Sequence, residues 1–136
     1  MLSCVQVMAQ KKLQDNHEIR FSGLTWEQAL QLAKSKKQLI FIDAFAVWCG
    51  PCKELKIKTF TDPAVADYFN SHFINISMDM EKGEGMKFAD QYGVDSYPTL
   101  LFIGSDGRLI RKSEGFSDAV ELLNLANNTL NNRRMR

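Results

Sequence analysis

Runs of apolar residues, and segments in which apolar and polar residues alternate, predict several β-strands in this chain. The run Leu39 to Phe45 is almost continuously apolar, which is typical of a central strand buried on both faces. The segment 73–80 alternates apolar and polar residues, the period of a strand. A strand over 99–103 is followed by Asp106-Gly107, which favours a hairpin turn because Asp-Gly tolerates positive φ, and a strand over 109–112 pairs back.

Between the strands, apolar residues recur at helical spacing, which predicts helices. The first helix runs from Thr25, where Gln28 completes a capping box, to Lys37, and the second from the cysteine pair to about Ile57. A third helix begins at Thr61-Asp62-Pro63, and a short fourth helix is ended by Gly93. The terminal helix is capped by Ser117 or Asp118. The terminal helix is expected to bury one apolar stripe, formed by Ala119, Val120, Leu123, Ala126 and Leu130.

The order of these elements predicts an α/β fold. Ile19 and Phe21 alternate with polar neighbours and predict a short edge strand at its start. A β-α-β half followed by a hairpin and a terminal helix gives a central mixed β-sheet flanked by helices on both faces.

Composition adds a limit on size and partners. A chain of 136 residues, 45% hydrophobic and 24% charged, suits one compact domain, which we place at residues 19–136. The net charge of +1 does not indicate nucleic-acid binding, and no apolar stretch is long enough to span a bilayer.

The first 18 residues form a separate segment. Met1 to Gln10 is apolar and small, and the stretch to Glu18 is polar. Val7-Met8-Ala9 resembles the small-residue end of a secretory signal, which favours export, with residues 1–18 as the remnant of a leader cleaved after Ala9. Lipid attachment at Cys4 and a frayed cytosolic N-terminus are the alternatives.

Two of the three cysteines form the motif that carries chemistry, Trp48-Cys49-Gly50-Pro51-Cys52-Lys53. In the first turn of a helix, side chains three residues apart share a face, so Cys49 and Cys52 can close a disulfide and reopen it. The helix N-terminus favours a thiolate on Cys49, and a proline fits the first turn. Half of a zinc site is the alternative, but only His17 and His72 could complete it and neither is at metal spacing, so we expect no metal.

Asp43 is a second candidate, because a carboxylate inside an apolar strand is costly unless it is hydrogen-bonded or functional. Desolvation should raise its pKa. The alternative is a strand that ends before Asp43, which would leave the carboxylate in water.

Together these features resemble the thioredoxin superfamily. The resemblance rests on an ordered set of residues: Asp43, the Trp-Cys-Gly-Pro-Cys-Lys motif, Tyr97-Pro98-Thr99, Asp106-Gly107 and Gly115. Lys36-Lys37, the stretch 59–63 and Asp79-Met80-Glu81 look closest to exported bacterial thioredoxin-like thiol-disulfide interchange proteins. They are also similar to the terminal redox domain of membrane thiol-reductant transporters.

The resemblance implies a thioredoxin fold and a role for each motif residue. Cys49 would be the exposed attacking thiol, Cys52 the resolving thiol, and Asp43 the base that takes the proton from Cys52. We expect substrate-binding residues around the cysteines, namely Trp48, Gly50, Pro51, Tyr97, Pro98 and Gly115. Pro98 would follow a cis peptide bond, so that Tyr97 presents its backbone to an extended substrate.

The sequence departs from the family pattern beside Asp43. Many thioredoxins carry a lysine there on the next strand, a position that we assign to Asn75. Asp43 would therefore lack a cationic neighbour.

The predicted function is a protein-disulfide reductase without an organic cofactor or a metal. Its expected partners are disulfide-containing proteins and an upstream thiol electron donor, for which a membrane thiol-reductant transporter is the candidate. We expect a monomer that is periplasmic or otherwise exported, with a cytoplasmic location as the alternative. A redox-independent binding module and a disulfide oxidase or isomerase are the alternative functions.

Overall fold

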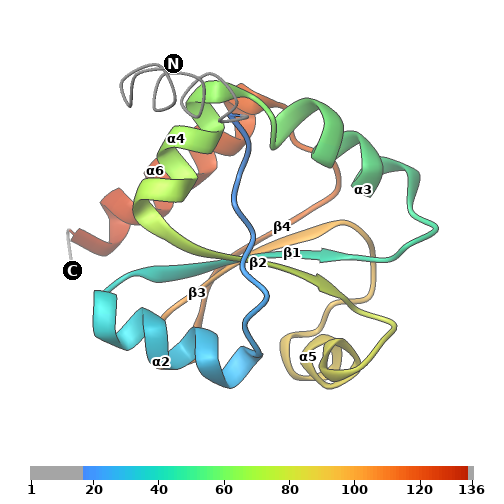
Figure 1. Ribbon diagram of the computed structural model, residues 1–136, viewed down its shortest axis with the longest axis horizontal. Coiled ribbons are helices and arrows are strands. Elements are labelled where there is room, and N and C mark those ends of the chain that lie inside the picture. The colour runs from blue at the N-terminus through green and yellow to red at the C-terminus, as the bar shows by residue number, and fades with distance from the viewer. Residues whose placement is uncertain (1–16, 135–136) are drawn as a thin grey trace, which may run out of the picture.

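A four-stranded mixed sheet runs through the molecule (Figure 1). The computed structural model of the chain describes residues 17–134. The strands are β1 (Leu39–Phe45), β2 (Phe73–Asp79), β3 (Thr99–Ile103) and β4 (Leu109–Glu114). Their order is β2-β1-β3-β4, with β1 parallel to β2 and the other two neighbouring pairs antiparallel. The predicted mixed sheet with β1 at its centre is confirmed.

Helices cover both faces of this sheet, as predicted. They are α2 (Trp26–Lys36), α3 (Gly50–Glu54), the π-helix η1 (Leu55–Thr59), α4 (Pro63–His72), α5 (Glu84–Tyr92) and α6 (Ala119–Arg134). In Figure 1, α2 and α5 lie on one side of the sheet and α3, α4 and α6 on the other. None of the helices within residues 17–134 has the length and apolar character needed to cross a membrane.

Local signals at the helix ends act as the sequence predicted. Thr25 accepts a hydrogen bond from the Gln28 backbone N–H, and the Gln28 side chain accepts one from the Thr25 N–H, which completes the capping box. Gly93 ends α5 in the left-handed conformation, with φ of 65°. At α6 the choice between two caps is settled, because Asp118 Oδ1 accepts the Glu121 backbone N–H at 2.9 Å.

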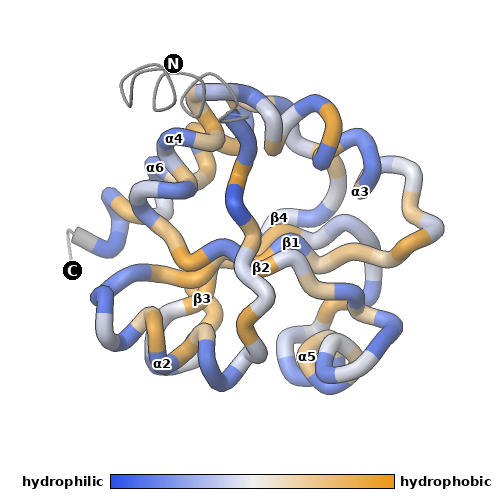
Figure 2. Tube along the Cα trace, viewed as in Figure 1, coloured by the Kyte–Doolittle hydropathy of each residue, from blue (hydrophilic) through white to orange (hydrophobic). Residues whose placement is uncertain are grey.

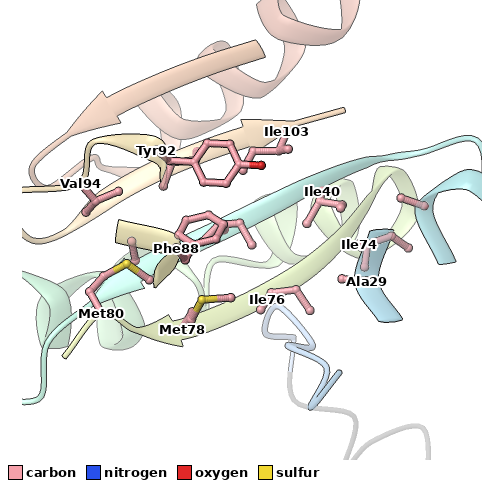
Figure 3. Close-up of a cluster of buried hydrophobic side chains, with 14 residues drawn as sticks. Ala29, Ile40, Ile74, Ile76, Met78, Met80, Phe88, Tyr92, Val94 and Ile103 are labelled. Atoms are coloured by element: carbon pink, nitrogen blue, oxygen red, sulfur yellow. The ribbon is translucent and has the colours of Figure 1, made fainter. Parts of the chain in front are cut away.

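Alternation along the strands divides the buried side chains into two clusters, one on each face of the sheet. Figure 2 shows hydrophobic residues concentrated along the strands. The cluster under α2 and α5 is shown in Figure 3 and includes Ile40, Ile42, Ile74, Ile76, Phe88, Tyr92 and Ile103. The opposite cluster, under η1, α4 and α6, includes Phe41, Leu55, Phe69, Phe73, Phe102 and Leu122. The face that holds the second cluster also carries the cysteine motif.

The predicted edge strand around Ile19 and Phe21 is wrong. The Ile19 N–H donates to the Phe60 carbonyl and the Ser22 N–H to the Asn75 carbonyl, both at 2.9 Å. A strand needs successive bonds to one neighbour, but these two bonds go to different elements. The alternation reflects burial alone, since Ile19 is 4% exposed.

The predicted stripe of the terminal helix is wrong in one position. Val120 is 67% exposed, whereas Leu122 is completely buried together with Ala126. Leu122 and Ala126 are four residues apart and therefore lie on the same side of α6.

The predictions for the segment 1–18 are untested. Cleavage after Ala9 and lipid attachment at Cys4 concern residues 1–16, which lie outside the described residues. The boundary at residue 19 therefore stays a prediction.

Candidate active site

The cysteine pair lies at the start of helix α3, which follows shortly after the end of β1. Cys49 is the N-cap residue, with extended backbone (φ −80°, ψ 113°), and its Sγ accepts the Cys52 backbone N–H at 3.1 Å. Pro51 occupies the first turn, where no N–H is needed. Cys49 and Cys52 form a disulfide, with their Cα atoms 5.3 Å apart. The predicted cysteine pair is therefore present in its closed, oxidised form.

Both cysteines are buried in this form, so the expectation that Cys49 is exposed is wrong here. Cys49 is 2% exposed and Cys52 is 3% exposed. They pack with Ala46, and the partly buried side chains of Phe45 and Tyr97 lie against this small cluster. Phe45 and Tyr97 therefore cover part of the cysteine pair.

Trp48 borders the disulfide and is 65% exposed. Its Nε1–H donates to Glu81 Oε1 at 2.7 Å, and its ring meets the Tyr97 ring edge-on at 5.8 Å between centroids. The Glu81 backbone N–H in turn donates to Asp79 Oδ1 at 2.9 Å. Asp79-Met80-Glu81 belonged to the motifs that carried the family resemblance, but sequence reasoning gave Glu81 no role.

Tyr97, Pro98 and Gly115 come together next to the cysteines. The Tyr97–Pro98 peptide bond is cis, as expected. The Gly115 N–H donates to the Pro98 carbonyl at 2.8 Å, so the end of β4 lies beside this bond. Gly115 has φ of +91°, which favours glycine, and a Cβ there would meet no atom within 4 Å. The backbone at Gly115 therefore borders open space, as does that at Gly50 in the cysteine motif.

Asp43 is buried inside β1, which rules out a strand that ends before it. Its side chain is 1% exposed, and Oδ2 accepts the Ser77 hydroxyl at 3.0 Å. Oδ1 is buried and has no hydrogen-bond partner within residues 17–134. Burial raises the pKa of Asp43 from 3.8 to about 6, against the opposing effects of the Ser77 hydrogen bond and the Lys56 charge.

The neighbour of Asp43 on β2 is Ser77, and the assignment of that position to Asn75 is wrong. In the parallel register Asp43 faces Ser77, while Asn75 faces Phe41. The Asn75 amide donates to the Phe69 carbonyl at 3.0 Å. A two-residue shift keeps every side chain on the same face, so the hydrophobic pattern could not separate these two registers.

No cation faces Asp43 from β2, where Ser77 stands, but the charge of Lys56 in η1 lowers the pKa of Asp43. The Lys56 Nζ lies 4.0 Å from the centroid of the Phe45 ring. Asp43 and Phe45 are two residues apart on β1 and thus point to the same face. The structure therefore brings Asp43 to the side of the sheet that carries the cysteine motif.

The two histidines considered as zinc ligands lie in α4 and beside it. His17 Nδ1 is 3.8 Å from Asp67, and His72 Nδ1 is 2.8 Å from the Tyr68 carbonyl. Within residues 17–134, His, Cys, Asp and Glu side chains do not gather in threes as a metal ion would require.

A large cavity lies away from these residues, at the start of β1. It has a volume of about 700 Å³ and a basic lining that includes Lys34, Lys36, Lys37, His72 and Arg133. None of the predicted site residues lines it.

A disulfide at a helix start, next to a central strand and a cis-proline, defines a dithiol protein of the thioredoxin fold. The chain belongs to the thioredoxin-like domain family, whose model matches residues 26–129. It is 33% identical over 107 residues to the thiol:disulfide interchange protein DsbD of Haemophilus influenzae, across 75% of this chain. It spans only 18% of the length of that relative.

Two solved structures agree with this assignment. A Bacteroides thetaiotaomicron protein, provisionally named a disulphide-isomerase, has 48% identity and a TM-score of 0.75, covering 83% of this chain and 93% of its own. The oxidised DsbD C-terminal domain of Neisseria meningitidis shares the fold, with 21% identity, a TM-score of 0.66, and coverage of 82% of this chain and 98% of its own. The protein is therefore a thioredoxin-like domain whose Cys49 and Cys52 form a disulfide.

Proposed function

We propose that the protein reduces disulfide bonds in other proteins. The Cys49 thiolate attacks one sulfur of the substrate disulfide, and the other substrate sulfur leaves as a thiolate that takes up a proton. Cys52 then attacks Cys49 Sγ, which breaks the mixed disulfide and releases the second substrate sulfur. The substrate gains two electrons, and the enzyme ends with the Cys49–Cys52 disulfide.

Asp43 is the proton acceptor for Cys52 in this scheme. A buried carboxyl with a pKa of about 6 is largely ionised at neutral pH, yet it binds a proton far more readily than an exposed aspartate. Its Oδ1 has no hydrogen-bond partner among the described residues, which leaves an acceptor free. Cys52 would lose its proton to this oxygen as it attacks Cys49.

We assign substrate binding to the residues that surround the cysteines. The backbone of Tyr97 and Pro98 would pair with an extended substrate segment, and Gly115 would allow that segment to approach closely. Trp48, whose ring meets that of Tyr97, would contact the substrate together with Gly50 and Pro51.

One observation carries the proposal: the Cys49 sulfur accepts a backbone N–H at a helix start, within a pair already closed as a disulfide. The same N–H would stabilise a thiolate on Cys49 when the pair is reduced. A reducing direction is supported by the Gly-Pro dipeptide between the cysteines, which resembles reducing thioredoxins.

The direction is tested by the equilibrium reduction potential of the pair, measured in thiol-disulfide buffers through Trp48 fluorescence. A value near the thioredoxin value of about −270 mV is expected, and a value near about −120 mV would instead assign an oxidase. Cys49→Ser should abolish reduction of insulin. Unchanged partner capture and unchanged cellular phenotype in Cys49→Ser would support a redox-independent binding module.

Disulfide isomerisation is a second candidate, favoured by the provisional name of the 48% identical Bacteroides protein. An isomerase should restore activity to scrambled ribonuclease without a net change in thiol content. The reduction potential of its cysteine pair should be about −180 mV, between the values of thioredoxins and of disulfide oxidases.

We further propose that the protein acts after export and receives electrons from a membrane thiol-reductant transporter. The similarity to a short part of the interchange protein DsbD and the small-residue pattern at Val7-Met8-Ala9 support this. Cys52→Ser protein that carries Cys49 as a mixed disulfide with a small thiol should exchange that thiol for a cysteine of the donor, and so trap the donor on Cys49 in exported fractions. Recovery of the protein in the cytoplasmic fraction alone would contradict export.

A further inference from the structure

The helix that follows the cysteines changes its winding after one turn. Regular α3 ends at Glu54, and the Phe60 N–H donates to the Leu55 carbonyl at 2.8 Å, five residues back, which defines the π-helix η1. Such π turns insert one extra residue and occur frequently at functional sites. In η1 the side chains of Leu55 and Thr59 are buried, and that of Lys56, which follows Leu55, is exposed.

Lys56 is held next to the candidate active site by its own contact. Its ammonium lies 4.0 Å from the centroid of the Phe45 ring, and Phe45 packs against the cysteine cluster. Lys56 is four residues after Cys52, in the π-helix that continues the cysteine helix. Asp43 is two residues before Phe45 on β1 and projects to the same face of the sheet.

Few other charged groups reach the Asp43 carboxyl. Among residues 17–134, β1 and β3 carry no further titratable side chain, and Ser77 of β2 is neutral. Asp79, on the same face at the end of β2, accepts the Glu81 backbone N–H. From the helix side, Lys56 is the charge that acts on Asp43, where it lowers the pKa against the larger effect of burial.

We propose that Lys56 is a positioning residue for proton transfer, which keeps the Asp43 carboxylate ionised so that it can accept the Cys52 proton. Lys56 remains protonated throughout. The proton moves from Cys52 Sγ to Asp43, and the resulting Cys52 thiolate attacks Cys49 Sγ and displaces the substrate sulfur. The proposal rests on the proposed reductase function. It supplies from the helix the cation that many thioredoxins carry on a strand.

The direct test is an NMR titration of the Asp43 carboxyl carbon in the oxidised protein. Lys56→Met should move the titration midpoint upward by roughly half a pH unit, because an exposed ammonium is partly screened by solvent. Lys56→Arg should restore the wild-type midpoint. Lys58→Met is the matched control: Lys58 lies in the same π-helix and faces Glu54 at 4.0 Å. An Asp43 midpoint in Lys56→Met equal to that of the Lys58→Met variant would overturn the proposal.

The pH profile of insulin reduction is the second readout. Lys56→Met should shift the acid limb of the rate upward by the same amount as the Asp43 midpoint, while Lys58→Met leaves the limb in place. A shifted midpoint with an unshifted rate profile would also overturn the proposal. Failure of the reductase function itself would be distinguishable, because the wild-type protein would then reduce no insulin at any pH.

Discussion

At the scale of single residues, burial of the Asp43 carboxyl lowers the folding stability of the protein, while the same carboxyl serves the proposed proton transfer. Its carboxyl is buried with one hydrogen bond, and its pKa is raised from 3.8 to about 6. Between these values the folded protein binds more protons than the unfolded chain, so stability falls as pH rises through this window. Above about pH 6 the full cost of a buried carboxylate is present.

Replacing Asp43 with asparagine should remove that cost. A pKa difference of this size corresponds to about 3 kcal/mol. Oxidised Asp43→Asn should therefore be more stable by up to about 3 kcal/mol at pH 8 and little changed at pH 3.5. Urea unfolding at both pH values measures the difference, with the exposed Asp90→Asn as control. A stabilisation that is the same at both pH values would contradict the assigned cause.

Glu81 is the residue that fixes the Trp48 indole. Glu81→Ala removes the acceptor at 2.7 Å, so the Trp48 indole N–H resonance should move upfield and stability should fall by about 1 kcal/mol. Glu81→Gln keeps an acceptor oxygen and should leave the resonance close to its original position. Equal spectra for the alanine and glutamine variants would show that this hydrogen bond is not made in solution.

At the scale of elements, strands and helices with strong hydrophobic periodicity could be predicted from the sequence, whereas the contacts between them could not. The run Leu39–Phe45 and the alternation from Phe73 gave strands close to the observed β1 and β2. The register between them was set by parallel pairing, which left Asn75 and Ser77 indistinguishable to a pattern of period two. The cysteine helix ends at Thr59 rather than near Ile57, because a π turn has no simple apolar signature.

Burial at the site was equally hard to predict. Cys49 was expected to be exposed, but the closed pair packs under Tyr97, a contact between segments far apart in the sequence. Ser77, which contacts Asp43, and Lys56, which contacts Phe45, are common polar types whose spacing has no motif. Glu81 stood in a motif, but its bond to Trp48 joins two segments far apart in the sequence. The motif residues themselves were predictable because their chemistry is unusual in an apolar strand or at a helix start.

A buried hydrogen bond joins the π-helix to the segment just before α6. The Thr59 hydroxyl, in a side chain that is 1% exposed, donates to the Ser117 carbonyl at 2.7 Å. Thr59→Val keeps the shape but leaves that carbonyl without its donor, so we expect a loss of about 1–3 kcal/mol in urea unfolding. Thr61→Val, at an exposed threonine that bonds the Ile57 carbonyl, should cost less than about 0.5 kcal/mol. Equal losses would mean that the bond to Ser117 adds no stability.

At the scale of the whole molecule, the sheet separates two cores and its ends carry different surfaces. The cysteine motif follows the end of β1, whereas the basic cavity lies at the start of the same strand. Lys34, Lys36 and Arg133 stand in the last turns of α2 and α6, where cations offset the partial negative charge of helix C-termini. That explanation suffices for the basic lining, and the cysteine pair lies at the opposite end of β1.

The core on the cysteine side is built around Phe41, which should dominate global stability. Its ring lies 4.7 Å from that of Phe69 and 5.2 Å from that of Phe102 between centroids, so it joins β1 to α4 and β3. Phe41→Ala should cost about 3–5 kcal/mol in urea unfolding, because the cavity sits at the junction of three elements. Val120→Ala, 67% exposed on α6, should change stability by less than about 0.5 kcal/mol.

The same variants separate folding from redox chemistry. The cysteines pack in a cluster of their own with Ala46, Phe45 and Tyr97, and Phe41 is not a member of it. Folded Phe41→Ala should therefore keep a reduction potential close to that of the wild type while it unfolds at much lower urea. A large change in potential together with the loss of stability would mean that the core and the disulfide form one cooperative unit, and that the site depends on the packing beneath the sheet face.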